Sequence, residues 1–356
     1  MFEVRAPGRV NLIGDHTDYQ GGFCLPMAID REVVVRAQGR TDGLVRARSD
    51  SFAGVVEIPA DGSRGPETVA RPWGRAIAAV LQELAALGRP PVGFDADITL
   101  TVPVGSGLSS SAAFMVAVAL TAARVGSLAI EPRALALVAQ ASEQASTGVP
   151  CGVMDQMASV FGRAGHALLL DCRSLDIEAV PLPPPVAVVV IHTGVARKLE
   201  DSAYAERRAA CEAAARRAGV ALLRDATLDQ VADDPIARHV VSENQRVLDF
   251  VQALRAGDLE RSGQLMISSH ASLRDDFRVS TAELDALVDA LVDAGALGAR
   301  LTGAGFGGCA VGLVAADAVD DVVGHAVARY RSGTGLTPTS FVVHAVDGAG
   351  LVEGGL

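Results

Sequence analysis

A cluster of ionisable side chains close to the start of the chain is the first candidate for chemistry. The segment GRVNLIGDHTDYQGG (8–22) contains Arg9, then Asp15, His16 and Asp18, between glycines and mostly apolar neighbours. A hydrophobic core does not tolerate such a set unpaired, and a solvated turn does not require it. Carboxylates and an imidazole can all take hydrogen bonds from hydroxyl groups, so the cluster suits recognition of a polyol. A transition-metal site is the alternative, but one imidazole among adjacent residues is a poor ligand set.

The second candidate is VPVGSGLSSSAA (102–113), a glycine-rich turn that opens an alanine-rich helix. Glycines let the backbone approach a ligand, and the first amides of a helix are unpaired donors at the positive end of its dipole. This combination is typical of an anion cradle, most naturally for phosphate, although a plain N-capped helix would share the pattern. It is not a Walker A loop, because no GK[ST] follows.

Two further segments complete the candidate chemistry. In SEQASTGVPCGVMDQMAS (142–159), Glu143 is expected in a helix and Asp155 follows a turn amid apolar residues. Such an aspartate needs a cation or hydrogen bonds, and Arg9 is a candidate partner, whereas a helix-capping role is the alternative. LTGAGFGGCAV (301–311) is a glycine-dense turn that could form a second wall against the phosphate loop.

Composition limits the classes of partner. The 356 residues are 49% hydrophobic and carry a net charge of -11, which disfavours nucleic acid and anionic membranes as partners. Five widely spaced cysteines without a CxxC pair predict neither a disulfide framework nor a zinc site. With no signal-peptide pattern at the start and no membrane-length apolar stretch, we expect a cytoplasmic protein. Lys198 is the only lysine, so a catalytic lysine would have to be this one.

These residues must be positioned by a mixed α/β fold, because β-branched runs alternate with alanine-rich stretches of helical period. Strands are expected at 33–38, 96–102, 166–171, 186–192, 309–314 and 341–346. Helices are expected at about 72–87, 109–125, 132–146, 199–219, 235–256, 258–270, 281–294 and 316–331. Ser280 or Thr281 is the expected N-cap of the helix at 281–294. The prolines of PLPPPV (181–186) predict a domain junction near 176–186.

Together these segments resemble the galactokinase branch of the GHMP small-molecule kinases. APGRVNLIGDHTDYQGG, VPVGSGLSSSAA and LTGAGFGGCAV match the three family motifs, and GVPCGVMDQ, HALLLDCRSL and SHASLRDDFRVSTAELDAL match further segments in the family's order. The resemblance implies an α/β (α+β) fold of two domains with the active site in the cleft between them. Its N-terminal ribosomal-S5-like α/β domain would span 1–178, and its C-terminal ferredoxin-like α/β domain 179–356.

The resemblance further implies transfer of the γ-phosphoryl group of ATP to the C1 hydroxyl of α-D-galactose, with Mg²⁺ as cofactor and the two small molecules as the only partners of a monomer. Asp155 and Arg9 match the catalytic pair, and Ser111 and Glu143 match the Mg²⁺ ligands. The residues that match sugar contacts are Asp15, His16, Asp18, Gly152 and Tyr204. Those that match nucleotide contacts are Trp73, Gly105, Ser106, Gly107, Leu108, Ser109, Ser110 and Ser111.

Two departures from the family pattern bear on the substrate. Galactokinases usually have glutamate where this chain has Asp15, whose carboxylate is set back by about 1.5 Å, the length of one C–C bond. The segment ARKLEDSAY (196–204) also differs from the sequence usual in the family. A related sugar 1-kinase, for N-acetylgalactosamine or a sugar altered at C6, is therefore the alternative. A non-catalytic sugar-sensing relative is disfavoured, because the catalytic and metal-binding residues are all present.

Overall fold

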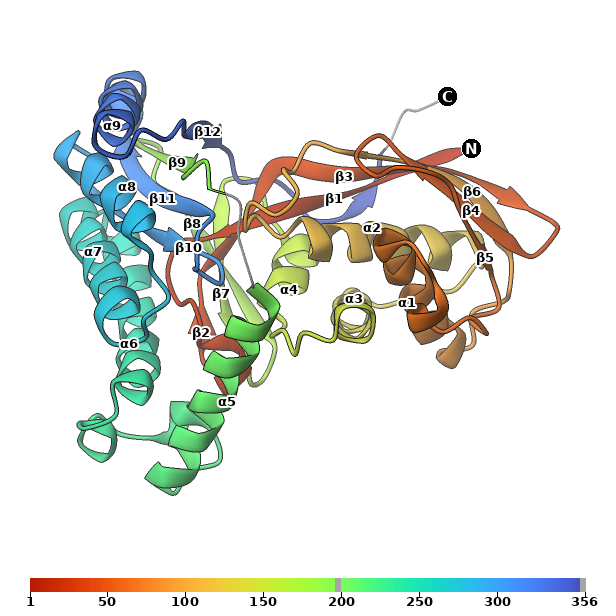
Figure 1. Cartoon of the computed structure of the whole chain (residues 1–356), viewed down its shortest axis with the longest axis horizontal. Helices are drawn as coiled ribbons and strands as arrows, with labels where there is room; N and C mark the ends of the chain where they lie inside the picture. The colour runs from red at the N-terminus through yellow and green to blue at the C-terminus, as the bar shows by residue number, and fades with distance from the viewer. Residues whose placement is uncertain (196–199, 353–356) are drawn as a thin grey trace.

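The computed structural model describes residues 1–195 and 200–352, so Lys198 and the rest of 196–199 lie outside the described residues. A six-stranded sheet forms one side of the molecule (Figure 1). In spatial order its strands are β13 (Gly350–Leu351), β1 (Phe2–Asn11), β3 (Pro26–Arg40), β6 (Gly93–Leu100), β4 (Leu44–Ser49) and β5 (Val56–Pro59). Its pairs are antiparallel except β4 with β6, which is parallel.

One face of this sheet is covered by helices. They are α1 (Pro72–Ala86), α2 (Ser110–Val125), α3 (Pro132–Thr147) and α4 (Met154–Phe161). Helices α2 and α4 pack directly on β1 and β3, and α3 packs on the other three helices (Figure 1). Alternation along β6 sets the buried face: Phe94, Ala96 and Ile98 are buried, whereas Asp95 and Asp97 point to solvent. Helix α2 is apolar nearly all round because it lies between the sheet and α3.

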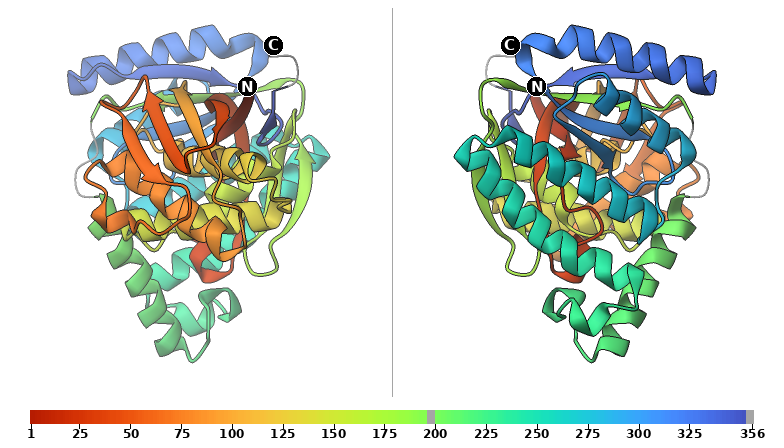
Figure 2. Two further views of the ribbon diagram at one scale, coloured as in Figure 1. Left: turned by 90° about the vertical axis from the view of Figure 1, so that its right-hand side faces the viewer. Right: turned by 90° about the vertical axis from the view of Figure 1, so that its left-hand side faces the viewer.

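A four-stranded antiparallel sheet forms the other side. Its strands are, in order, β10 (Gly298–Thr302), β11 (Cys309–Ala315), β9 (Val186–His192) and β12 (Thr339–Val343). The helices of this half are α5 (Glu200–Ala218), α6 (Pro235–Ala256), α7 (Leu259–Asp275), α8 (Ala282–Asp293) and α9 (Val319–Thr334). Helices α6 and α7, in teal, run side by side on the outer face in the right-hand view of Figure 2. Strand β10 packs against both α7 and α8.

A small third sheet and five short turns complete the described elements. The sheet orders β2 (Phe23–Cys24), β7 (His166–Asp171) and β8 (Asp176–Pro181). The 3-10 turns are η1 (Asp18–Gln20), η2 (Pro66–Thr68), η3 (Leu223–Asp225), η4 (Asp229–Val231) and η5 (Ala316–Ala318). No helix in the described ranges is long and apolar enough to cross a membrane.

The elements expected from sequence are present, with helix boundaries that mostly agree within a few residues. Thr281 is the N-cap of α8, where its hydroxyl accepts from the Leu284 amide at 3.3 Å. Sequence patterns did not predict β1, β10, α4 or the β4–β5 hairpin. The expected division at 178/179 falls inside β8, and β13 returns to pair with β1. The division into 1–178 and 179–356 stays a proposal about domain organisation.

Candidate active site

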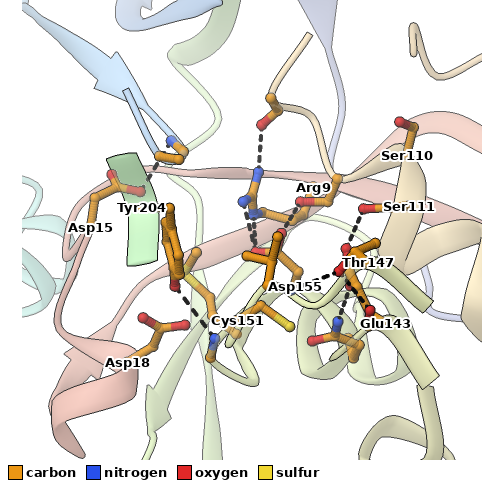
Figure 3. A pocket seen from close by; sticks show the side chains of 18 of the residues that line it. Arg9, Asp15, Asp18, Ser110, Ser111, Glu143, Thr147, Cys151, Asp155 and Tyr204 are labelled. Atoms are coloured by element: carbon orange, nitrogen blue, oxygen red, sulfur yellow. Dashed lines mark hydrogen bonds and ion pairs between the residues drawn. The ribbon is translucent and has the colours of Figure 1, made fainter. Parts of the chain in front are cut away.

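A cavity of about 360 Å³ lies between the two halves of the molecule. Its walls come from β1 and the loop after it, the phosphate loop, α3, α4, α5 and the turn after β10. Figure 3 shows how side chains from these separate elements point toward one another. Residues from the four candidate segments, which are distant in sequence, therefore line one cavity.

Arg9 and Asp155 form the ion pair at the centre of this cavity. Arg9 Nε donates to Asp155 Oδ1 at 2.8 Å, and Arg9 Nη2 lies 2.7 Å from the same oxygen. Arg9 Nη1 donates to the Gly107 carbonyl at 2.7 Å, which ties the arginine to the phosphate loop. The other carboxylate oxygen, Asp155 Oδ2, accepts from the Ser109 hydroxyl at 2.5 Å. The pairing of Arg9 with Asp155 is confirmed, and Asp155 lies in the first turn of α4 rather than capping it.

Strand β1 brings Arg9 to this position because Gly8 lets the phosphate loop pass close to the strand. The register of β1 with β3 shifts between Pro7 and Arg9, and the Arg9 amide donates to the Leu108 carbonyl at 3.0 Å. A Cβ atom at Gly8 would lie 2.5 Å from that carbonyl oxygen. Only glycine therefore allows this approach without moving the loop.

The phosphate loop divides into residues that line the cavity and residues that do not. Lining it are Gly105, Gly107, Ser109, Ser110 and Ser111. Ser106 and Leu108, which are also expected at the nucleotide, do not line the cavity, and their assignment to the nucleotide stays a prediction. The Ser106 hydroxyl donates to the Pro103 carbonyl at 2.7 Å, and the Leu108 side chain is buried in the core. Ser106 lies between Gly105 and Gly107, whose φ angles of 71° and 83° are in the left-handed region that glycine adopts readily.

Ser111 and Glu143 form a pair of hard oxygen donors beside the start of α2. The Ser111 hydroxyl donates to Glu143 Oε1 at 2.5 Å, and Gln156 Nε2 donates to Oε2 at 2.5 Å. Burial raises the pKa of Glu143 to about 7. The described residues contain no group of three or more His, Cys, Asp and Glu side chains that could hold a metal ion. This donor set fits Mg²⁺, which commonly takes one or two protein oxygens and completes its shell with phosphate and water.

At the opposite end of the cavity lie Asp18, Gly152 and Tyr204. The Gly152 amide donates to the Tyr204 hydroxyl at 3.4 Å, and a Cβ atom at Gly152 would lie 1.7 Å from Asp18 Oδ2. A side chain at position 152 would therefore displace the carboxylate. Burial, together with repulsion from Asp155, raises the pKa of Asp18 to about 6.

His16 lines the same end, but both of its ring nitrogens are bonded to protein atoms. Nε2 lies 3.1 Å from the Ala304 carbonyl and so carries the proton, and Nδ1 accepts from the Tyr19 hydroxyl at 3.0 Å. Burial lowers the pKa of His16 to about 3, which keeps the ring neutral. The ring therefore joins the cavity wall to the turn after β10, and the assignment of His16 to the sugar stays a prediction.

Two predicted residues have surroundings that the sequence did not indicate: Trp73 lies outside the cavity lining, and Asp15 pairs with a buried arginine. Trp73 begins α1 outside the cavity lining, where its ring stacks on Phe52 with centroids 6.0 Å apart. Its Nε1 is buried without a hydrogen-bond partner in the part of the chain that the structure describes. Asp15 lines the cavity, is 1% exposed, and contacts Arg300, a residue that no sequence pattern singled out. The only sequence signal was a charge directly before LTGAGFGGCAV.

Comparison with known proteins identifies the family. The chain is 48% identical to a galactokinase of a Roseiflexus species, over 98% of this chain and 92% of that protein, and 48% identical to a galactokinase of Chloroflexus aurantiacus, over 93% and 88%. The chain belongs to the galactokinase family. Family models agree: a galactokinase galactose-binding signature matches residues 2–38, a GHMP kinase N-terminal domain matches 73–163, and a GHMP kinase C-terminal domain matches 250–330.

The fold comparison gives the same family. The crystal structure of Lactococcus lactis galactokinase complexed with galactose superposes with a TM-score of 0.93 at 34% identity, covering 98% of this chain and 94% of that one. The expected two-part GHMP kinase fold is therefore confirmed, and the chain is a sugar kinase.

Proposed function

We propose that this chain transfers the γ-phosphoryl group of ATP to the C1 hydroxyl of α-D-galactose, giving galactose 1-phosphate and ADP. The observation that carries the proposal is the Arg9–Asp155 pair, which lies in one cavity with the Ser111–Glu143 pair. The names of the full-length relatives, and of the solved relative that holds galactose, support the choice of sugar.

In the proposed reaction, the C1 oxygen bonds to the γ-phosphorus while the bond from that phosphorus to the β–γ bridging oxygen breaks. Asp155 orients the C1 hydroxyl and takes up its proton, and ADP leaves with the bridging oxygen. Arg9 pairs with the Asp155 carboxylate and stabilises negative charge on the transferred group. Positioning and electrostatics supply most of the acceleration in such transfers.

The amides at the start of α2 and the loop residues Gly105, Gly107, Ser109, Ser110 and Ser111 would hold the phosphates. Ser111 and Glu143 would hold Mg²⁺, which when bound neutralises phosphate oxygens. Trp73 would lie near the adenine, and its unpartnered Nε1 supports a role in contacting a ligand. The sugar would lie between Asp15, Asp18, His16, Gly152 and Tyr204.

A related sugar 1-kinase is the second candidate, and the placement of Asp15 favours it. The shorter carboxylate at this position is nearly fully buried, so it reaches less far into the cavity than a glutamate would. A hexose altered at C6, or N-acetylgalactosamine, would then compete with galactose. In either case we propose a cytoplasmic monomer whose partners are small molecules.

A substrate panel tests the proposal. Purified protein is assayed with ATP, Mg²⁺ and either galactose, N-acetylgalactosamine, 6-deoxygalactose, glucose or mannose, and the phosphorylated position is located by ³¹P–¹H NMR. Galactose should give the highest kcat/KM, with phosphate on C1. A higher value for another hexose would replace galactose as the substrate.

A further inference from the structure

Arg300, on β10, is a fully buried arginine next to the sugar end of the cavity. Its exposed fraction is 0%, and it is the largest of the fully buried side chains in the described ranges. It does not line the cavity itself. Removing a guanidinium from water costs several kcal/mol unless a close partner compensates, so the position of its partner indicates its role.

Asp15 is that partner. Arg300 Nη1 lies 2.6 Å from Asp15 Oδ2, and it donates more weakly to the Asn11 carbonyl at 3.4 Å. The remaining guanidinium nitrogens, Nε and Nη2, form no hydrogen bond with any described residue. The closest counter-charge to this arginine is therefore the carboxylate on the cavity wall.

Glu243, the other acidic side chain near Arg300, is already compensated. Its Oε1 is 3.9 Å from Arg300 Nη2, whereas its Oε2 accepts from Arg246 Nε at 2.6 Å. The Gly14 amide and the Ser269 hydroxyl also donate to Oε1. Burial alone would raise the pKa of Glu243, but Arg246 first, then His239 and Arg300, hold it at about 2. Arg246 is thus the direct partner of Glu243 at 2.6 Å, whereas Arg300 reaches Glu243 only at 3.9 Å and Asp15 at 2.6 Å.

Both oxygens of Asp15 contact one short segment of chain. Oδ1 accepts from the Gly303 amide at 3.1 Å, and Oδ2 faces Arg300 three residues earlier. Oδ2 is thus compensated mainly by the charge of Arg300, 2.6 Å away. Burial raises the pKa of Asp15, and Arg300 is the first of the charges that oppose this shift. Without Arg300, the carboxyl would take up a proton or turn to another donor.

We propose that Arg300 is a positioning residue for the sugar: by pairing with Asp15, it fixes the place and charge of the carboxylate that meets a substrate hydroxyl. The inference rests on the proposed function, because it assigns the cavity end that contains Asp15 to the sugar. Arg300 itself touches neither the sugar nor the reacting phosphorus. Its effect is therefore on sugar affinity and reaches the sugar only through Asp15.

A double-mutant cycle tests this dependence. Kinetics with ATP and galactose are measured for wild type, Arg300→Met, Asp15→Asn and the double variant, with Arg300→Lys to restore the charge. Loss of a hydrogen bond to a charged group corresponds to about tenfold or more, so Arg300→Met should raise the KM for galactose by about that factor. We expect kcat and the KM for ATP to stay within about threefold, since neither depends on Asp15. Arg300→Lys should recover part of the affinity.

The decisive comparison is the Asp15→Asn background, in which Arg300→Met should change the KM for galactose by less than about twofold. Arg89→Met is the matched control, because Arg89 is another buried arginine, bonded to the Ala60, Val92 and Ala122 carbonyls away from the cavity. It should lower Tm without changing the KM for galactose. If Arg300→Met is not recovered folded, Arg300→Lys takes its place in the cycle, with the same non-additivity expected.

Additive effects on KM in the double variant would overturn the proposal, because Arg300 would then not act through Asp15. The proposal would also be overturned if Arg300→Met lowered Tm as Arg89→Met does and left the KM for galactose unchanged. Arg300 would then have a structural role only. Failure of the proposed function gives a different result: wild type would not phosphorylate galactose. The same cycle, run on whichever hexose is phosphorylated, would then test the role of Arg300.

Discussion

At the scale of single residues, the site consists of pairs in which one side chain holds the other in position by a hydrogen bond or an ion pair. Asp155 is held by Arg9 on one oxygen and by Ser109 on the other. Two of the loop serines therefore have different partners, since Ser111 donates to Glu143 and Ser109 donates to Asp155, the carboxylate proposed to receive the sugar hydroxyl. Ser109 adopts a left-handed backbone conformation, with φ 61°, which a non-glycine residue rarely adopts.

Replacing Asp155 by Asn should abolish turnover, because the amide cannot take up the hydroxyl proton and loses the charge that pairs with Arg9. Nucleotide binding should be largely retained, since Asp155 does not belong to the phosphate loop. Steady-state kinetics together with calorimetric titration of a non-hydrolysable ATP analogue measure the two effects. Near-normal kcat in this variant would remove Asp155 from the mechanism.

Ser109→Ala should lower kcat by roughly ten- to a hundredfold, because a hydrogen bond to a charged group contributes about 1.5–3 kcal/mol. The KM for ATP should change little if the hydroxyl serves Asp155 rather than the phosphates. Calorimetric titration of Ser109→Ala with a non-hydrolysable ATP analogue supplies the control, in which the Kd for the nucleotide should stay close to that of wild type. A large rise in the KM for ATP with unchanged kcat would show that the Ser109 hydroxyl, and not only the loop backbone, contacts the nucleotide.

Protonation of Asp18 should make kcat/KM for galactose fall on the acid side of its pH profile. Its pKa is raised to about 6, so the carboxylate is ionised above that pH and neutral below it. If the ionised form accepts a sugar hydroxyl, kcat/KM for galactose should fall as pH decreases through about 6, because this ratio reports groups in the free enzyme. Asp18→Asn should have a lower ratio and lack that fall. A fall on the acid side that persists unchanged in Asp18→Asn would assign it to another group.

At the scale of elements, the site depends on how closely the phosphate loop approaches β1. Gly8 permits the contact between the Arg9 amide and the Leu108 carbonyl. A single position on the strand therefore sets the distance between the phosphate loop and β1. Helix α4 then presents Asp155 from its first turn, directly opposite Arg9. The geometry of the pair is thus set by backbone packing rather than by the two side chains alone.

Gly8→Ala should move the loop, because the added methyl group would lie 2.5 Å from a backbone oxygen and 2.9 Å from Val102 Cγ2. Overpacking of this kind typically costs about 1–3 kcal/mol, and we expect a lower Tm together with a fall in kcat. Gly39→Ala is the matched control, since Gly39 lies on neighbouring β3 and has no atom within 4 Å of the added Cβ. Equal effects of the two substitutions would show that the approach at Gly8 is not important.

At the scale of the whole molecule, the cavity joins elements from the two halves of the chain. Arg9 and Asp155 come from the half with the six-stranded sheet, whereas Tyr204 and Gly303 come from α5 and from the turn after β10. A ligand that contacts both sides should stabilise the native state as a unit. Strand β13, which returns from the end of the described chain to β1, links the two halves a second time.

Galactose should therefore raise the Tm of the free protein. Binding at a concentration 100 times Kd adds about 2.7 kcal/mol to the free energy of unfolding, which is several degrees for a chain of this size. Differential scanning calorimetry with galactose, and with glucose as the control sugar, measures the effect. No shift at saturating galactose would contradict a sugar site between the two halves.

The sequence by itself determined the parts of this protein that local patterns encode. Periodicity located α2 and α6, the hydroxyl of Thr281 marked a helix start, and the charges at Arg9 and Asp155 required a partner. The motifs and their order along the chain also resemble those of the galactokinase family, which periodicity and charge alone do not indicate. Strand β1 was not predicted because Pro7 and Gly8 are poor strand formers, and pairing with β3 overrides that preference.

Only the tertiary structure decided which neighbours the functional groups have. Asp15 and Arg300 are 285 positions apart in sequence, and Ser109 and Asp155 are 46 apart, yet each pair is in contact. Hydrogen bonds and ion pairs depend on distances of a few ångströms, which strand register and helix packing set and which residue types alone do not encode. The sequence therefore showed that these charges needed partners, and the fold determined that Arg300 would hold Asp15.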